Sequence, residues 1–186
     1  MIVRLITILM LFNICLSFGF DPLYLNDKNR TPVERTGDLF QIAIPLSGLG
    51  YTYYSNDNIG RKQFWRTYLS SLTLTYILKY TIKKERPNGH CCESFPSGHT
   101  SAAFAGAMFI NNRYGSKVGI PAILLASFVG YSRVYAEKHY WEDVLAGALI
   151  SVISSIFYTT SINTNNENIS LFLNPLNNKI SINLKI

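Results

Sequence analysis

The feature that most constrains this chain is a series of apolar segments separated by short polar stretches. They occupy residues 1–20, 38–54, 64–85, 100–110, 118–136 and 141–160. Segments of this length predict helices, and the third ends at Arg86-Pro87, where proline opposes helix continuation. Short connections make successive helices antiparallel. The sequence therefore predicts an all-α fold, an up-and-down bundle of about six helices.

The composition favours a bundle embedded in a membrane. Only 15% of the residues are charged, while 48% are hydrophobic and gathered into segments. Residues 100–110 are short for a membrane span, so a soluble and very apolar helical domain is the alternative. The net charge of +6 favours anionic partners, such as phosphate-bearing lipids or nucleic acid.

The domain organisation predicted is simple, with no repeat and no second domain. Residues 1–20 are a signal peptide or a first transmembrane helix, and residues 21–160 form the helical domain. Within it, residues 21–37 and 55–63 are polar and predict surface segments. Residues 161–186 form a polar tail, either a short hairpin or disordered.

The cysteines predict no metal site. Cys15 lies in an apolar run, and Cys91 and Cys92 are adjacent in a polar loop without zinc-ligand spacing. A bond between neighbouring cysteines would be strained, so none is expected. The chain is expected to need neither metal nor cofactor.

Three polar clusters interrupt the apolar segments. Lys79 and Arg86 are seven residues apart, which on a helix places them on one face. The second cluster, Pro96-Ser97-Gly98-His99, precedes a predicted helix, and the third contains Ser132-Arg133, His139 and Asp143. In an up-and-down bundle all three fall at the same end.

These side chains suit chemistry on a phosphate group. A lysine and two arginines match a tetrahedral oxyanion, and Ser97 and Gly98 lie at a helix N-terminus, where backbone N–H groups bind anions. Two histidines, His99 and His139, supply an acid and a nucleophile. Asp143 follows His139 by four residues, so a shared helical face would let it orient the imidazole.

The same residues resemble the signature of the type 2 phosphatidic acid phosphatase and vanadium-dependent haloperoxidase superfamily, K-x6-R-P, P-S-G-H and S-R-x5-H-x3-D. Every signature position is filled, in order, between residues 79 and 143. The resemblance implies a metal-free phosphatase in which His139 forms a phosphohistidine and His99 protonates the leaving oxygen. It further implies that Lys79, Arg86, Ser97, Gly98 and Arg133 bind the phosphate oxygens.

The expected substrate is a phosphorylated lipid, either a monoester or a pyrophosphate, with no nucleic-acid partner. With Arg4 on the cytoplasmic side, the catalytic end faces the extracytoplasmic, periplasmic side of a cell-envelope membrane. A soluble exported acid phosphatase is the main alternative. A vanadate haloperoxidase is less favoured because the chain is short for that class. A catalytically inactive membrane scaffold is less favoured because the set of catalytic groups is complete.

Overall fold

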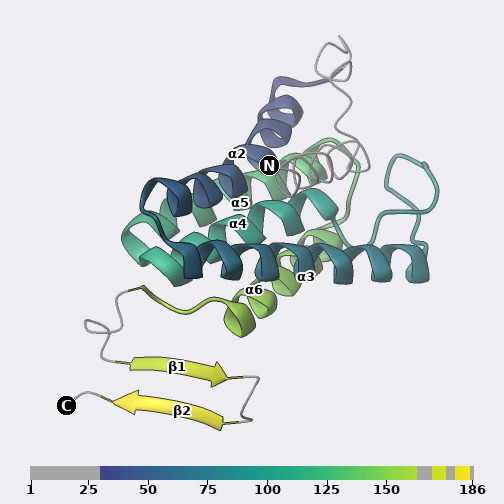
Figure 1. Cartoon of the computed structure of the whole chain (residues 1–186). Coiled ribbons are helices and arrows are strands. Elements are labelled where there is room, and N and C mark those ends of the chain that lie inside the picture. The colour runs from purple at the N-terminus through teal and green to yellow at the C-terminus, as the bar shows by residue number, and fades with distance from the viewer. Residues whose placement is uncertain (1–29, 163–168, 175–178, 185–186) are drawn as a thin grey trace, which may run out of the picture.

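The computed structural model describes residues 30–162, 169–174 and 179–184 (Figure 1). Five helices form the bundle: α2 (Pro32–Tyr54), α3 (Asn58–Ile82), α4 (Gly98–Tyr114), α5 (Ser116–Tyr135) and α6 (Trp141–Tyr158). The predicted all-α class is confirmed. The predicted first segment, residues 1–20, lies outside the described residues.

Helices α2 and α3 begin well before the predicted starts, because local caps start them. Thr31 accepts a hydrogen bond from the Glu34 N–H and Pro32 occupies the first turn, so residues 32–37 are helical rather than loop. Asp57 accepts from the Gly60 N–H at 2.8 Å and starts α3 at Asn58, which shortens the predicted 55–63 linker to a tight turn.

Helix α4 lies at the centre of the bundle and packs against α2, α3, α5 and α6 (Figure 1). Small residues make this possible, since Ala102, Ala103, Ala105 and Ala107 are all buried. A Cβ added at Gly106 would lie 2.6 Å from the Cα of Pro45 on α2, so this helix crossing needs glycine. Pro45 itself lies inside α2, and Figure 1 shows that α2 is bent.

Short connections set the direction of each helix. Gly115 alone, with φ of 90°, separates α4 from α5, and a tight turn separates α2 from α3. At that end of the bundle Arg113 forms a buried ion pair with Asp57 at 2.7 Å. The loops 83–97 and 136–140 meet at the opposite end, where the Asn88 N–H donates to the Glu137 carbonyl oxygen at 3.1 Å.

The C-terminal segment contains a β-hairpin, one of the two states predicted for it. Strand β1 (Ile169–Asn174) pairs antiparallel with β2 (Lys179–Leu184), in a register that places Ile169 opposite Leu184. The hairpin lies beside the helical bundle rather than within it (Figure 1).

Candidate active site

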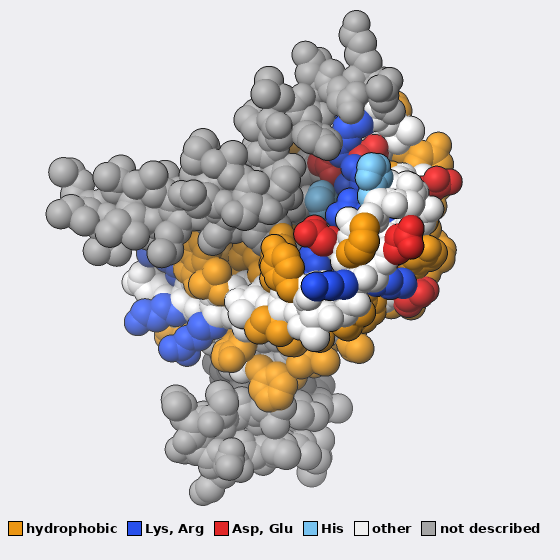
Figure 2. Space-filling view, turned by 90° about the vertical axis from the view of Figure 1, so that its right-hand side faces the viewer, with side chains coloured by type: hydrophobic (Ala, Val, Ile, Leu, Met, Phe, Trp, Pro, Cys, Tyr) orange, Lys and Arg blue, Asp and Glu red, His pale blue; other side chains and the backbone are white. Residues whose placement is uncertain are grey.

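The three motifs meet at the end of the bundle that carries the 83–97 and 136–140 loops. Figure 2 looks onto this end and shows basic, acidic and histidine side chains gathered between hydrophobic surfaces. Lys79 comes from the last turn of α3, Gly98 begins α4, Arg133 lies in the last turn of α5, and Asp143 lies in the first turn of α6. Four helices therefore supply the site.

Lys79 and Arg86 do not share a helical face, contrary to the prediction. Helix α3 ends at Ile82 because Lys83 adopts a left-handed conformation with φ of 49°, which places Arg86 in the following loop. Lys79 is buried, and its ammonium group donates to the Glu93 carbonyl oxygen in that loop. Among the described residues, the Arg86 side chain has no hydrogen-bond or ion-pair partner, so its guanidinium is free to bind an anion.

The N-terminus of α4 is buried against α6. Ser97 caps the helix, and its own N–H donates to the Asp143 carbonyl oxygen at 2.9 Å. A Cβ at Gly147 would lie 2.6 Å from the Ser97 carbonyl oxygen, so glycine allows α6 to approach this closely. The first N–H groups of a helix have no partner within it, and they point toward the end of the bundle where the motifs meet.

His139 is oriented by a backbone carbonyl. Its Nδ1–H donates to the Ser94 carbonyl oxygen at 2.7 Å, which leaves the lone pair on Nε2. The pKa of His139 lies below its ordinary value because the ring is buried, with Lys79 and Arg86 adding positive charge nearby. The imidazole is therefore held neutral, as a nucleophile requires.

Asp143 lies near His139 but not on the predicted shared helical face. Helix α6 begins at Trp141, so His139 belongs to the preceding loop, and Nδ1 is 3.8 Å from the Asp143 Oδ2. That separation is longer than a hydrogen bond. The electrostatic attraction across 3.8 Å still favours a positive charge on His139.

The carboxylate of Asp143 instead holds two loops together. Its fully buried side chain accepts from the Ser94 hydroxyl, from the Tyr140 N–H at 2.9 Å and from the Lys84 ammonium at 2.8 Å. Ser94 thus links Asp143 to His139, because its hydroxyl donates to the Asp143 carboxylate and its carbonyl oxygen accepts from the His139 Nδ1–H. Sequence reasoning missed Ser94, which lies between the first two motifs, and Lys84, which occupies an unspecified position within the first.

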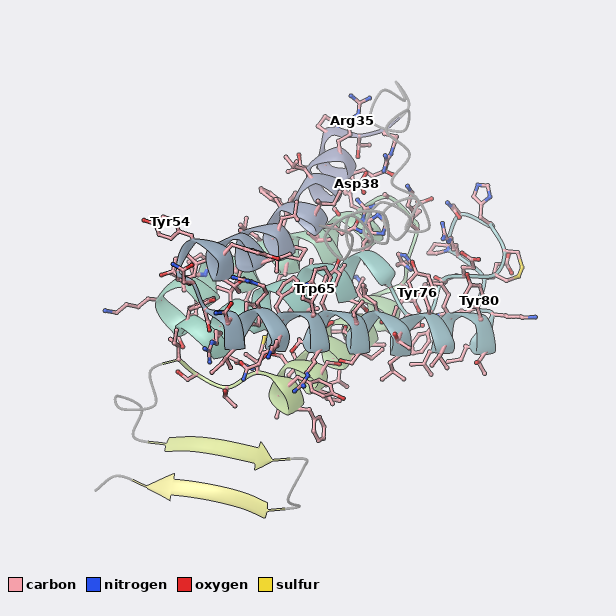
Figure 3. The ribbon with its side chains drawn as sticks, in the orientation of Figure 1. Arg35, Asp38, Tyr54, Trp65, Tyr76 and Tyr80 are labelled. Carbon is pink, nitrogen blue, oxygen red and sulfur yellow. A yellow bond between two sulfur atoms is a disulfide. The ribbon has the colours of Figure 1, made fainter. Side chains whose placement is uncertain are left out.

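Helix α2 adds a carboxylate that no motif contains. Arg133 is only 1% exposed, and its Nη1 lies 2.7 Å from the Asp38 Oδ1 while its Nη2 donates to the Glu34 carbonyl oxygen at 2.8 Å. The same Asp38 oxygen is 3.3 Å from the His99 Nε2. Figure 3 labels Asp38 on α2, with Tyr76 and Tyr80 on the neighbouring α3. The sequence signal for Asp38 was its position as the last acidic residue before the apolar run 39–54.

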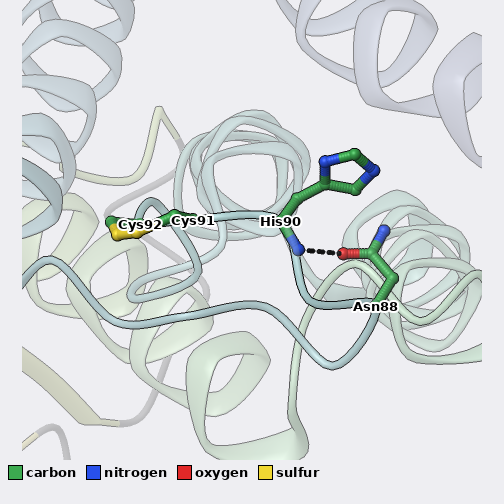
Figure 4. The surroundings of a disulfide bond; sticks show 4 residues. All are labelled: Asn88, His90, Cys91 and Cys92. Atoms are coloured by element: carbon green, nitrogen blue, oxygen red, sulfur yellow. Dashed lines mark hydrogen bonds between the residues drawn. A yellow bond between two sulfur atoms is a disulfide. The ribbon is translucent and has the colours of Figure 1, made fainter.

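Cys91 and Cys92 lie next to each other in the 83–97 loop, with their side chains on the same side of the backbone (Figure 4). In the same loop the His90 N–H donates to the Asn88 side chain at 3.2 Å. The His90 carbonyl oxygen accepts a hydrogen bond from the Arg86 N–H at 3.1 Å, so the backbone of this loop contacts the first motif. In the described part of the chain, no group of three or more His, Cys, Asp or Glu side chains is arranged to hold a metal ion.

Comparisons with known proteins identify relatives of this arrangement. The chain is 32% identical over 134 residues to a lipid A 1-phosphatase of Porphyromonas gingivalis, covering 66% of this chain and 29% of that protein. It is 32% identical over 123 residues to lipid phosphate phosphatase 2 of Arabidopsis thaliana, covering 54% of this chain and 42% of that protein. The chain thus spans less than half the length of either relative.

A solved structure shares the fold, and a family model matches the site-bearing helices. The crystal structure of Aquifex aeolicus LpxE superimposes with a TM-score of 0.52 at 26% identity, covering 72% of this chain and 88% of that one. The model of the PAP2 superfamily matches residues 64–167, more than half of the chain, from α3 to beyond α6. The chain therefore belongs to the PAP2 superfamily.

Proposed function

We propose that this protein is a metal-independent phosphatase that hydrolyses a lipid phosphate monoester or pyrophosphate through a phosphohistidine intermediate. One observation carries the proposal: His139, with its Nδ1 bound to the Ser94 carbonyl oxygen, lies at the same bundle end as Lys79, Arg133 and the N-terminus of α4. A nucleophile and several anion-binding groups at one site suit a phosphoryl group.

In this proposal each group has a role. The Nε2 lone pair of His139 attacks phosphorus, forming a P–N bond as the P–O bond to the leaving group breaks. His99 gives its proton to the leaving oxygen. It then takes a proton from the water that attacks phosphorus, as the P–N bond breaks and releases phosphate and neutral His139. Lys79, Arg86, Ser97, Gly98 and Arg133 bind the phosphate oxygens and stabilise the charge that develops on them. Asp143 stabilises the cationic imidazole and, through Ser94, its orientation.

The outer surface of the bundle suits a lipid bilayer. Helices α5 and α6 are long and apolar enough to cross a membrane, and Leu124, Leu145 and Leu149 on them are more than half exposed. Exposed aromatic side chains lie toward both ends of the bundle, as at the two interfaces of a bilayer. Those toward the site end are Tyr80, Tyr135, Tyr140 and Trp141, and those at the other end are Tyr51, Tyr53, Tyr54 and Tyr158.

This placement puts the site at headgroup depth, where a lipid phosphate reaches it. The related proteins named lipid A 1-phosphatase and lipid phosphate phosphatase support a lipid substrate for this chain. Exposed Lys62, Arg66 and Lys117 lie at the opposite end, and their positive charge supports a cytoplasmic location for it. The catalytic end then faces the extracytoplasmic side.

Phosphate release from defined lipids tests the activity. Purified protein in detergent micelles is expected to release phosphate from phosphatidic acid, lipid A or a polyprenyl pyrophosphate, and His139→Ala is expected to release none. Recovery of all activity in a detergent-free extract would favour the soluble exported phosphatase. Activity of His139→Ala equal to that of the unmodified protein would contradict the phosphohistidine route.

An accessibility experiment tests the orientation. Asn88→Cys, in a background with the native cysteines replaced, places a thiol at an exposed position of the 83–97 loop. Labelling of intact cells by a membrane-impermeant thiol reagent is expected. Labelling only after lysis would show that the site faces the cytoplasm.

A further inference from the structure

Asp38 of α2 lies outside the matched family region, residues 64–167, and outside all three motifs. It is nevertheless 8% exposed and contacts two groups of the site, Arg133 on α5 and His99 on α4. A buried carboxylate is costly unless charged or polar partners compensate it. Its partners show what this carboxylate does.

Three cationic or titratable groups surround Asp38. Arg30 forms an ion pair with it, the Arg133 Nη1 lies 2.7 Å from its Oδ1, and the His99 Nε2 lies 3.3 Å from the same oxygen. The neighbouring Glu34 has its own compensating partners, Arg30 and Lys138. Asp38 is therefore the acidic side chain of α2 that faces the catalytic groups.

The contact between Arg133 and Asp38 leaves a donor available. Although the Arg133 Nη1 and the Asp38 Oδ1 are 2.7 Å apart, neither atom forms a well-aligned hydrogen bond in the described part of the chain. The Nη2 of Arg133, in contrast, is committed to the Glu34 carbonyl oxygen. Asp38 thus holds the guanidinium electrostatically, and Nη1 keeps a donor that no well-aligned acceptor among the described residues uses.

The contact with His99 matters for proton transfer. A general acid must carry its proton when the leaving group departs, and a carboxylate favours the protonated form of an adjacent imidazole. Burial of the His99 ring disfavours this protonated form, and so do Arg133 and His139, which are cations or become cationic. Asp38 is the acidic group that opposes these effects.

We propose that Asp38 is a positioning residue of this active site, which orients His99, favours its protonated form and holds Arg133 in place for phosphate. The proposal rests on the phosphatase function proposed above and adds a carboxylate from α2 to the family's motif residues. It makes α2 part of the catalytic unit rather than only a packing helix.

The experiment compares Asp38→Asn with the matched control Asp57→Asn. Asp57 is also a buried carboxylate paired with an arginine at 2.7 Å, but it lies at the opposite end of the bundle. Each variant is assayed on p-nitrophenyl phosphate, whose leaving group needs little acid assistance, and on phosphatidic acid, whose alkoxide leaving group needs a proton. The readout is the ratio of the two kcat/KM values.

For Asp38→Asn we expect the loss on phosphatidic acid to exceed the loss on p-nitrophenyl phosphate by about tenfold, part of the roughly 10²–10⁴ that general acid catalysis supplies. The alkaline limb of its pH profile on phosphatidic acid should also move to lower pH, because an unassisted His99 loses its proton sooner. Asp57→Asn should keep the ratio and the profile of the unmodified protein. Asp38→Glu, which retains the carboxylate, should restore much of the ratio.

An unchanged ratio in an active, folded Asp38→Asn would overturn this inference and leave the proposed function standing. If Asp38→Asn does not fold, Asp38→Glu becomes the deciding variant, because it keeps the negative charge. A ratio of the two kcat/KM values in Asp38→Glu as altered as that in His99→Ala would overturn the inference. An unmodified protein that is inactive on both substrates would overturn the proposed function and this inference together.

Discussion

Gly37 sets how closely α2 approaches the phosphate-binding arginine. A Cβ added there would lie 2.7 Å from the Ser132 Cβ and 2.9 Å from the Arg133 Nη2. Carbon atoms in contact normally lie about 3.5–4.0 Å apart. Gly37→Ala would therefore push α2 away from α5 by about 1 Å, with a steric cost of roughly 1–3 kcal/mol.

Gly50→Ala is the matched control for this change. Gly50 lies on the same helix, and a Cβ there would meet nothing within 4 Å. Each substitution gains roughly 0.5–1 kcal/mol of helix propensity, so the difference between the two variants reports the contact with α5 alone. Gly50→Ala is expected to keep full activity and to unfold at an equal or slightly higher temperature.

Two measurements separate the variants. The midpoint of thermal unfolding of Gly37→Ala should lie below that of Gly50→Ala by about 2–12 °C, since 1 kcal/mol corresponds to about 2–4 °C in a chain of this size. Displacing α2 breaks the hydrogen bond from Arg133 to the Glu34 carbonyl oxygen, so the guanidinium is no longer held in position for phosphate. A charged hydrogen bond is worth about 1.5–3 kcal/mol, so the kcat/KM of Gly37→Ala for p-nitrophenyl phosphate should fall by about 10–100-fold. If Gly37→Ala matched Gly50→Ala in unfolding temperature and activity, the close approach of α2 would not be what positions Arg133.

Three further predictions concern the chemistry. His139→Ala should be inactive on every substrate, whereas His99→Ala should retain far more activity on p-nitrophenyl phosphate than on a lipid. Asp143→Asn should have intermediate activity. Equal losses for the two histidine variants on both substrates would contradict their assigned roles. Because the pKa of His139 lies below its ordinary value, its neutral form persists to lower pH, so kcat/KM should rise with pH along an acid limb centred below about 6.5; a limb centred above that value would count against His139 as the nucleophile. Activity should survive EDTA and be inhibited by vanadate, and loss to EDTA with recovery on adding magnesium would contradict a metal-free route.

Much of this protein follows from patterns within single segments. Apolar runs of helical length predicted the bundle, because helix length and periodicity are encoded within each segment, and apolar helices must pack against one another to bury their side chains. Alternation of helix direction then placed Lys79, Ser97 and Arg133 at one end, since short connections leave antiparallel packing as the available arrangement. Motif spacing and topology were enough for this part of the site.

Helix ends were harder to predict, because they depend on individual backbone conformations. The left-handed Lys83 ends α3 before Arg86, and α6 begins after His139, so neither expected shared face exists. Such stops are set by competing local contacts at one or two residues, which a periodicity of 3.6 residues does not report.

The tertiary structure alone decided which groups hold the catalytic residues. Asp38 contacts Arg133, and Ser94 contacts His139, across 95 and 45 positions of sequence respectively. Such contacts depend on how closely two backbones approach, as at Gly37 against Ser132, and that distance follows from packing of the whole bundle. Sequence spacing carries information along one helix, whereas a carboxylate supplied by another helix becomes recognisable only when the chain has folded.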